Sequence, residues 1–193
     1  MIPYLPKFIL KLSNLISIVS LPRKDRRIVF YSEGRNYWVH LEALIKEFLS
    51  QSNVPVVYIS SNGDDPGLKY CHVRYKSYEI DEGFGRDWLF ANLDTDVMVM
   101  TMPDLHQYQV KRSKFDVHYV YTQHSLVSLQ MVYRKGAFDY FDTVFCSGPH
   151  HVSEMRLIEK VGNLSKKLLP EIGYPRLDAI LNQAQENKSK RNS

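Results

Sequence analysis

The residues of this sequence best suited to chemistry are histidines that follow predicted strands. His124 comes directly after the β-branched and aromatic run 117–122. A neutral imidazole there can accept a proton from a hydroxyl that attacks a phosphate, and histidine suits this role because its unperturbed pKa of about 6.5 lies near neutral pH. The alternative from position alone is that His124 caps the next helix, with Ser125 sharing that role.

A pair of histidines, His150 and His151, opens another predicted helix just after Gly148. Free amide groups at a helix N-terminus attract anions, so this turn could help to seat a phosphate. Adjacent helical residues point in different directions, and we therefore expect one of the two histidines to be structural. We find no ligand spacing typical of metal sites, and we predict no metal and no tightly bound cofactor.

Weaker candidates follow other predicted strands or lie between them. Glu33 and Gly34 could bring a carboxylate and a backbone amide to a ligand. Asp104 follows a proline, where aspartate often only forms a turn. Arg112 belongs to a short basic cluster that could meet a phosphate or could simply be solvated. The residues that we predict to bind substrate on these grounds are Glu33, Gly34, Asp104, Arg112, Ser125, Gly148 and His150.

The common catalytic fingerprints are missing from the sequence. No serine nucleophile elbow, P-loop or GxGxxG pattern follows the first predicted strand. The two cysteines, Cys71 and Cys146, stand far apart in apolar, strand-like segments and lack a zinc-binding spacing. We predict two buried thiols of a cytosolic protein.

Short β-branched runs alternate with helical patterns from Arg27 onward, which is typical of βαβ units around a parallel sheet. The predicted strands are 28–31, 54–60, 97–101, 117–122 and 143–147. The predicted helices are 37–50, 84–92, 126–135 and 149–161. The predicted fold class is α/β, a Rossmann-like parallel sheet with helices on both faces. Ligands of such sheets bind beyond the carboxyl ends of the strands, so the polar turns there should share one edge.

Residues 1–26 form a separate basic and amphipathic segment. Read as a helix, residues 5–19 place apolar side chains on one side and Lys7 and Lys11 on the other. The basic run 23–27 would attract anionic headgroups, while the lysines argue against a membrane-spanning helix. We predict that this segment lies on the inner face of the cell membrane, so that the protein is cytoplasmic and attached peripherally to that membrane. The alternative is an ordinary helix that covers the domain's own core.

The net charge of +4 is concentrated near the two ends of the chain. Residues 1–27 carry six basic residues against one acidic residue, and residues 186–193 carry three against one. The stretch between them is therefore mildly acidic, whereas a nucleic-acid-binding domain needs cations on its folded surface. We predict no nucleic-acid partner. The folded domain should span 27–181, and the polar residues 182–193 should form a disordered linker.

Five segments stand in order within residues 27–181, namely 28–34, 101–105, 119–125, 138–151 and 173–178. Together these segments resemble the first half of the CDP-glycerol glycerophosphotransferase family, which makes teichoic-acid-type polymers. The most specific is the last, Gly-Tyr-Pro-Arg-Leu-Asp, which adds Tyr174 and Arg176 to the predicted substrate-binding residues.

The resemblance implies the N-terminal lobe of a GT-B-type transferase with His124 as general base. A C-terminal lobe or partner chain, without a counterpart in this sequence, would bind a CDP-activated polyol donor. The implied reaction moves glycerol phosphate, or a related polyol phosphate, to a phosphate-bearing or lipid-linked acceptor. The family has His-Gly-Thr where this chain has His124, Ser125 and Leu126, which implies a different acceptor or altered chemistry.

Two rival functions stay open at this point. One half of a GT-B glycosyltransferase or epimerase would share the fold but use a nucleotide-sugar donor. A membrane-docked accessory domain would keep the basic helix and would not need His124 for catalysis.

Overall fold

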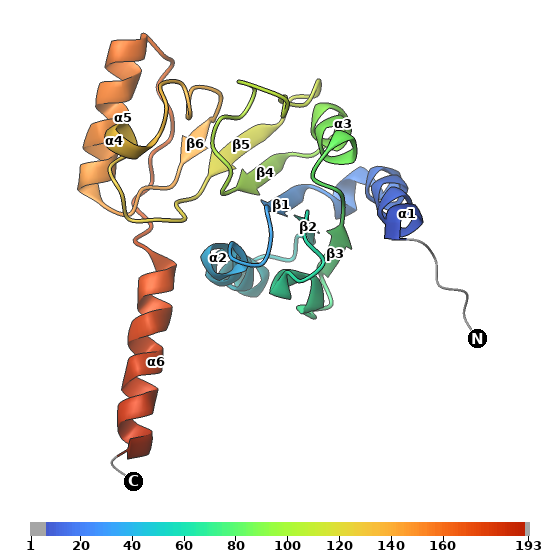
Figure 1. Ribbon diagram of the computed structural model, residues 1–193, viewed down its shortest axis with the longest axis horizontal. Coiled ribbons are helices and arrows are strands. Elements are labelled where there is room, and N and C mark those ends of the chain that lie inside the picture. Colours follow the sequence, from blue (N-terminus) through green and yellow to red (C-terminus); the bar gives the residue numbers. More distant parts are fainter. Residues whose placement is uncertain (1–6, 192–193) are drawn as a thin grey trace.

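The computed structural model describes residues 7–191 and is built around a six-stranded parallel sheet (Figure 1). The strands are β1 (Ile28–Ser32), β2 (Val56–Ser60), β3 (Tyr75–Glu79), β4 (Val97–Met100), β5 (His118–Tyr121) and β6 (Thr143–Val144). Their spatial order is β3-β2-β1-β4-β5-β6. This is the strand order of dinucleotide-binding Rossmann sheets, and the predicted fold class is confirmed.

Helices cover both faces of the sheet. They are α1 (Lys7–Ser20), α2 (Trp38–Gln51), α3 (Phe84–Asn92), α4 (Leu129–Val132), α5 (Pro149–Gly162) and α6 (Pro175–Arg191), with short 3-10 turns η1 (Arg23–Asp25) and η2 (Pro66–Lys69). One core cluster joins the sheet to α1, α3 and α5, and a second joins the opposite face to α2. Figure 1 shows α6 projecting from this body.

The alternation of side chains along the strands explains the two cores. In β1, Val29 and Tyr31 belong to the first cluster, while Phe30 belongs to the second. All of β2 is buried, as expected of a central parallel strand that is covered on both faces. The near-continuous apolar runs in the sequence therefore correspond to the middle of the sheet.

Several elements differ from the sequence-based prediction, and strand β6 covers only Thr143–Val144 of the predicted 143–147. The edge strand β3 was not predicted, because Tyr-Lys-Ser-Tyr-Glu carries the polar residues that edge strands tolerate. The helix predicted at 126–135 is only the single turn α4. After it, the chain folds back over the sheet and buries Ala137, Phe138 and Phe141.

The prediction of a disordered linker at 182–193 is wrong for residues 182–191, which continue α6. This stretch contains Ala, Gln, Glu, Lys and Arg, which favour helix, and it has no glycine or proline. Residues 192–193 lie outside the described residues, as do residues 1–6 of the predicted membrane segment.

The prediction of two buried thiols holds for one cysteine only. Cys146 is buried beside β6, and burial raises the pKa of its thiol to about 11. Cys71 is exposed, because it lies in the loop between η2 and β3 and not within a strand.

The N-terminal helix α1 is present, and it packs on the domain with part of its apolar surface. Leu15 and Ile18 enter the core, while Lys11 pairs with Glu79 at 3.0 Å. Apolar residues on the rest of α1 stay exposed, namely Phe8, Ile9, Leu10, Leu12 and Ile16. The helix therefore covers the core, as the alternative interpretation held, and still presents an apolar surface. Within residues 7–191 no helix has both the length and the hydropathy to cross a membrane.

A buried carboxylate ties the ends of β1 and β2 together. Asp65 is fully buried, and its Oδ2 accepts hydrogen bonds from Ser32 (2.7 Å), Ser60 (2.7 Å) and Tyr58 (2.8 Å). Its Oδ1 accepts a bond from the amide of Gly67 at 2.8 Å. Because Ser32 and Ser60 are partners in the sheet register, this carboxylate holds the turns after both strands.

We expect Asp65→Ala to lower the free energy of unfolding by about 2–4 kcal/mol, because it leaves buried hydroxyl groups without an acceptor. Urea unfolding measures the change. The neighbouring Asp64 is exposed, and Asp64→Ala should change stability by less than about 0.5 kcal/mol. Equal stability of the two variants would contradict the assigned role of the carboxylate.

Candidate functional site

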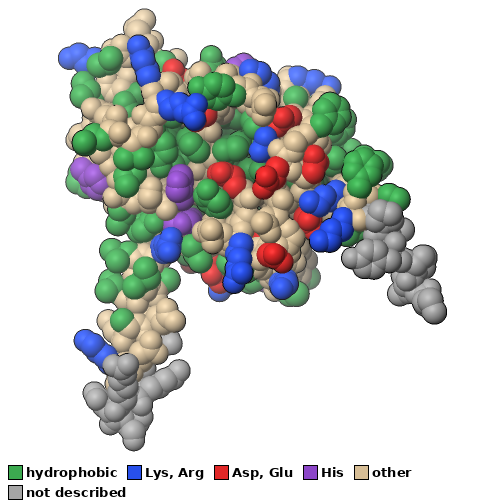
Figure 2. Space-filling model, in the orientation of Figure 1, with side chains coloured by type: hydrophobic (Ala, Val, Ile, Leu, Met, Phe, Trp, Pro, Cys, Tyr) green, Lys and Arg blue, Asp and Glu red, His purple; other side chains and the backbone are tan. Residues whose placement is uncertain are grey.

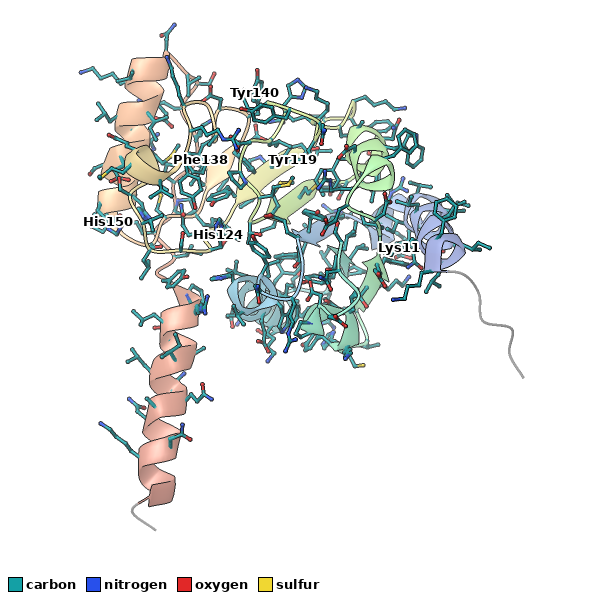
Figure 3. The ribbon with its side chains drawn as sticks, viewed as in Figure 1. Lys11, Tyr119, His124, Phe138, Tyr140 and His150 are labelled. Carbon is teal, nitrogen blue, oxygen red and sulfur yellow. The ribbon has the colours of Figure 1, made fainter. Side chains whose placement is uncertain are left out.

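The candidate site lies at the carboxyl ends of the strands, where the direction of the crossovers reverses. The chain leaves β1 toward β2 on one face of the sheet, and it enters β4, on the other side of β1, from the opposite face. Such a switch point leaves a crevice that is not covered by a crossover. His124 lies at this edge just after β5, close to the start of α6 (Figure 3).

Aromatic side chains surround the ring of His124. The ring centroids of Tyr37, Tyr121, Tyr133 and His40 lie 5.7, 6.4, 6.2 and 6.2 Å away. The hydroxyl of Tyr121 is 3.3 Å from Nδ1 of His124 and also donates to the hydroxyl of Tyr133 at 3.0 Å. The imidazole is therefore held by neutral groups.

Burial lowers the pKa of His124 below its ordinary value, and a hydrogen bond with the Thr101 backbone opposes that effect only in part. The imidazole is therefore mostly neutral at pH 7. A neutral, partly buried imidazole can accept a proton, which is the chemistry expected of it from the sequence. His124 lies in the turn after the buried strand β5, and its carbonyl accepts a hydrogen bond from Tyr174 at 3.1 Å.

His40 is part of this cluster, although it was not among the predicted site residues. It lies in the first turn of α2, and only 4% of it is exposed. Burial, followed by the nearby charge of Arg176 and by His124, lowers the pKa of His40 to about 4. From the sequence, its one signal was its place in the helix that follows the Glu33 turn.

The predicted residues Tyr174 and Arg176 meet the two histidines at the start of α6. The hydroxyl of Tyr174 donates to the carbonyl of His124 at 3.1 Å and lies 3.5 Å from Nδ1 of His40. Nη1 of Arg176 lies 3.3 Å from Nε2 of His40. Segments from α2, the β5 turn and α6 therefore converge on one cluster.

Glu33 and Gly34 form the turn after β1, next to the same cluster. Burial raises the pKa of the Glu33 carboxyl, while the charge of Arg86 acts in the opposite direction. Gly34 has φ of 149°, and a Cβ atom there would come within 2.9 Å of the Asn62 side chain. Glycine is therefore required for the close approach of the turns after β1 and β2.

The turn before α5 makes its hydrogen bonds outside the cluster around His124. Gly148 caps α5 and His150 is exposed. His151 is buried, and its ring bonds to the carbonyl of Val127 at 3.0 Å and accepts from the amide of Ser147 at 3.3 Å. His151 is thus the structural member of the pair. Among the described residues, no hydrogen bond joins this turn to the His124 cluster.

The remaining predicted site residues lie apart from His124 or have structural contacts. Ser125 follows His124 and is partly buried. Asp104 adopts φ of 61° in the β4–β5 connection, and its amide donates to the carbonyl of Ala137 at 2.9 Å, which is the role of a turn former.

Arg112 lies at the opposite edge of the sheet. It pairs with Asp142 at 3.1 Å and donates to the carbonyl of Val117, and these residues precede β6 and β5. The structure therefore does not bring Arg112 to the site. The reason is that the β4–β5 connection runs the length of the sheet, which a local basic cluster does not reveal.

The part of the chain that the structure describes contains no group of three or more histidine, cysteine or carboxylate side chains placed to hold a metal ion. The side chains at the site offer imidazole, hydroxyl, carboxyl and guanidinium groups.

Comparisons with known proteins add a likeness in fold. No protein-family model and no curated protein matches the sequence. Solved structures of the wall teichoic acid polymerase TagF, one of a variant and two of that variant soaked with CDPG for 15 and 30 minutes, superpose with TM-scores of 0.53 to 0.54 at 14–16% identity. They cover 93–94% of this chain, which spans about half of their length (45–51%). At this identity the likeness shows the fold alone.

We expect the depressed pKa of His40 to make stability depend on pH. The unfolded chain binds a proton at His40 near pH 6.5, whereas the folded protein does so only near pH 4. The free energy of unfolding should therefore fall as the pH drops from 7 to 4, by up to about 3 kcal/mol from this residue.

Denaturant unfolding at several pH values, of the native protein and of His40→Gln, isolates this contribution from that of the carboxyl groups. His40→Gln should have the flatter dependence, and His72→Gln, outside the cluster, should keep the native slope. Parallel curves for the native protein and His40→Gln would show that His40 is not held neutral.

Proposed function

We propose that this chain is the N-terminal, acceptor-side part of a CDP-glycerol glycerophosphotransferase-like enzyme. It would transfer glycerol phosphate, or a related polyol phosphate, to a phosphate-bearing or lipid-linked acceptor of a cell-surface polymer. The sequence resemblance over residues 27–181 and the shared fold with a teichoic acid polymerase support this proposal. The observation that carries it is the neutral, partly buried His124 at the switch-point edge of the sheet.

In the proposed reaction, His124 accepts the proton of the acceptor hydroxyl as its oxygen attacks the β-phosphate of the CDP-linked donor. A new phosphorus–oxygen bond forms, the bond from that phosphorus to the bridging oxygen breaks, and CMP leaves. Transfers of this kind depend mainly on positioning and on cations or donors around the phosphoryl oxygens. Glu33, Gly34, Ser125 and Tyr174 line the same edge and would orient the substrates.

We propose that the donor is bound by a second lobe or a partner chain, as in a GT-B cleft. The predicted turn at Gly148 and His150 would then face that partner with its helix N-terminus. A nucleotide-sugar transferase half would share this geometry and differ in the donor. A non-catalytic accessory domain would not require the imidazole of His124.

The decisive measurement is release of CMP from CDP-glycerol with a glycerol-phosphate or lipid-linked acceptor, in the presence of the donor-binding lobe. We expect His124→Ala to lower turnover by about 10²–10⁴-fold, because the base is lost. His72→Ala, in the loop before β3, is the matched control and should turn over normally. Full activity of His124→Ala would favour the accessory-domain interpretation, and turnover with a sugar nucleotide alone would favour the glycosyltransferase.

We also propose that the protein binds the cytoplasmic face of the membrane through α1 and α3. A groove of about 420 Å³ lies between these helices and is lined mostly by apolar residues, including Leu12, Ile16 and Trp88. Phe8 and Phe84 on its rim are 76% and 82% exposed. Figure 2 shows apolar side chains over α1 and α3 with basic and acidic side chains beside them. Apolar surface next to cations is what anionic bilayers bind.

Deleting the N-terminal helix is a poor test, because Leu15 and Ile18 are core residues. We expect Phe8→Ser combined with Phe84→Ser to lower partition onto phosphatidylglycerol-containing vesicles by about tenfold or more. Met131→Ser, on α4 at the other end of the molecule, removes an equally exposed apolar side chain and should leave partition unchanged. Vesicle cosedimentation measures this partition. Equal partition of the native protein, the double phenylalanine variant and Met131→Ser would contradict the membrane proposal.

A further inference from the structure

Arg176 has an unusual partner for a guanidinium group. Its Nη1 lies 3.3 Å from Nε2 of His40, a neutral ring, and it forms no ion pair with any described side chain. Arginine side chains near a protein surface usually meet a carboxylate or stay in water. Here the guanidinium is exposed and also contacts a buried acceptor, and it has no carboxylate partner among the described side chains.

We propose that Arg176 binds a phosphoryl group of the substrates and that His40 is the positioning residue that aims its guanidinium. This inference rests on the proposed transferase function and deepens it, because it names the group that would hold the phosphate. A guanidinium has several N–H donors in one plane, and using one of them on His40 leaves the others free for a bidentate phosphate contact. Figure 2 shows histidine side chains and a cation together near the start of α6.

The placement of Arg176 relative to His124 supports this role. The ring of His40 lies 6.2 Å from that of His124, and the ring of Tyr174 lies 5.8 Å from that of His40. The hydroxyl of Tyr174 also donates to the His124 carbonyl at 3.1 Å. A phosphoryl group on Arg176 would therefore lie beside the imidazole that takes the proton.

A neutral partner serves this purpose better than a charged one. A carboxylate next to Arg176 would cancel the charge that attracts the phosphate, and a protonated imidazole would repel the guanidinium. His40 avoids both, because burial keeps its ring neutral at ordinary pH. The same ring can hold Arg176 by hydrogen bonding without reducing its charge.

Isothermal titration of the full chain with sn-glycerol 3-phosphate, at low salt, tests the site. We expect Arg176→Gln to weaken binding by about tenfold or more, the usual effect of losing a charge-assisted contact. His40→Leu should weaken it to a similar degree, whereas His40→Gln, which keeps an acceptor, should stay within about threefold of the native protein. Lys188→Gln, a matched loss of charge further along α6, should bind as the native protein does.

A parallel titration with CDP distinguishes the source of the phosphoryl group. A loss confined to glycerol 3-phosphate assigns Arg176 to the acceptor, and a loss confined to CDP assigns it to the donor. Native-like affinity of Arg176→Gln for both ligands would overturn the proposal, and equal weakening by His40→Gln and His40→Leu would overturn the role of His40. If His40→Leu fails to fold, Arg176→Gln still decides, because its side chain is exposed.

Binding is measured without turnover, so the two proposals fail separately. Absence of CMP release together with the expected binding pattern would contradict the transferase and leave the phosphate site in place.

Discussion

The structure depends on the constraint that right-handed crossovers place on a parallel sheet. Because β1 is followed by a crossover to β2 on one side and flanked by β4 on the other, the connections must lie on opposite faces of the sheet. No crossover then covers the crevice between the carboxyl ends of β1 and β4, and the turns after β1, β2 and β5 share one open edge. The buried Asp65 secures this edge by joining the turns after β1 and β2.

At this edge, burial decides the chemistry. The rings around His124 remove water from the imidazole, and the loss of hydration disfavours its charged form. The same effect is larger at His40, where the charge of Arg176 adds to it. The neutral ring of His40 can thus lie beside the guanidinium of Arg176. The guanidinium of Arg176 thus carries positive charge beside His40, and the imidazole of His124 is in the form that can accept a proton.

Much of the sheet was predictable from the sequence, because its central strands are continuous apolar runs that only a covered parallel sheet can bury. The helix Phe84–Asn92 was predicted with its observed ends. The edge strand Tyr75–Glu79 was not predicted. It pairs with one strand only and most of its residues are not fully buried, so its sequence is not a continuous apolar run.

The candidate site shows the same limit. His124, Tyr174 and Arg176 are recognisable as parts of local motifs, and the fold brings them together. His40 carries only a weak signal, its place in the helix after the Glu33 turn, because its contacts form only when the start of α6 meets α2. Arg112 illustrates the converse: its cluster has the right composition, but the β4–β5 connection takes it to the opposite edge.

The start of α6 links the shape of the molecule to this chemistry. Residues 177–185 of α6 are exposed, and near its start Tyr174 and Arg176 contact His40 and His124. The side chains that direct α6 away from the body are therefore the ones that surround the proposed base. Tyr174 contributes to both histidines, because its hydroxyl donates to the carbonyl of His124 and lies near Nδ1 of His40. The contacts of Tyr174 and Arg176 thus belong both to the start of α6 and to the surroundings of His40 and His124.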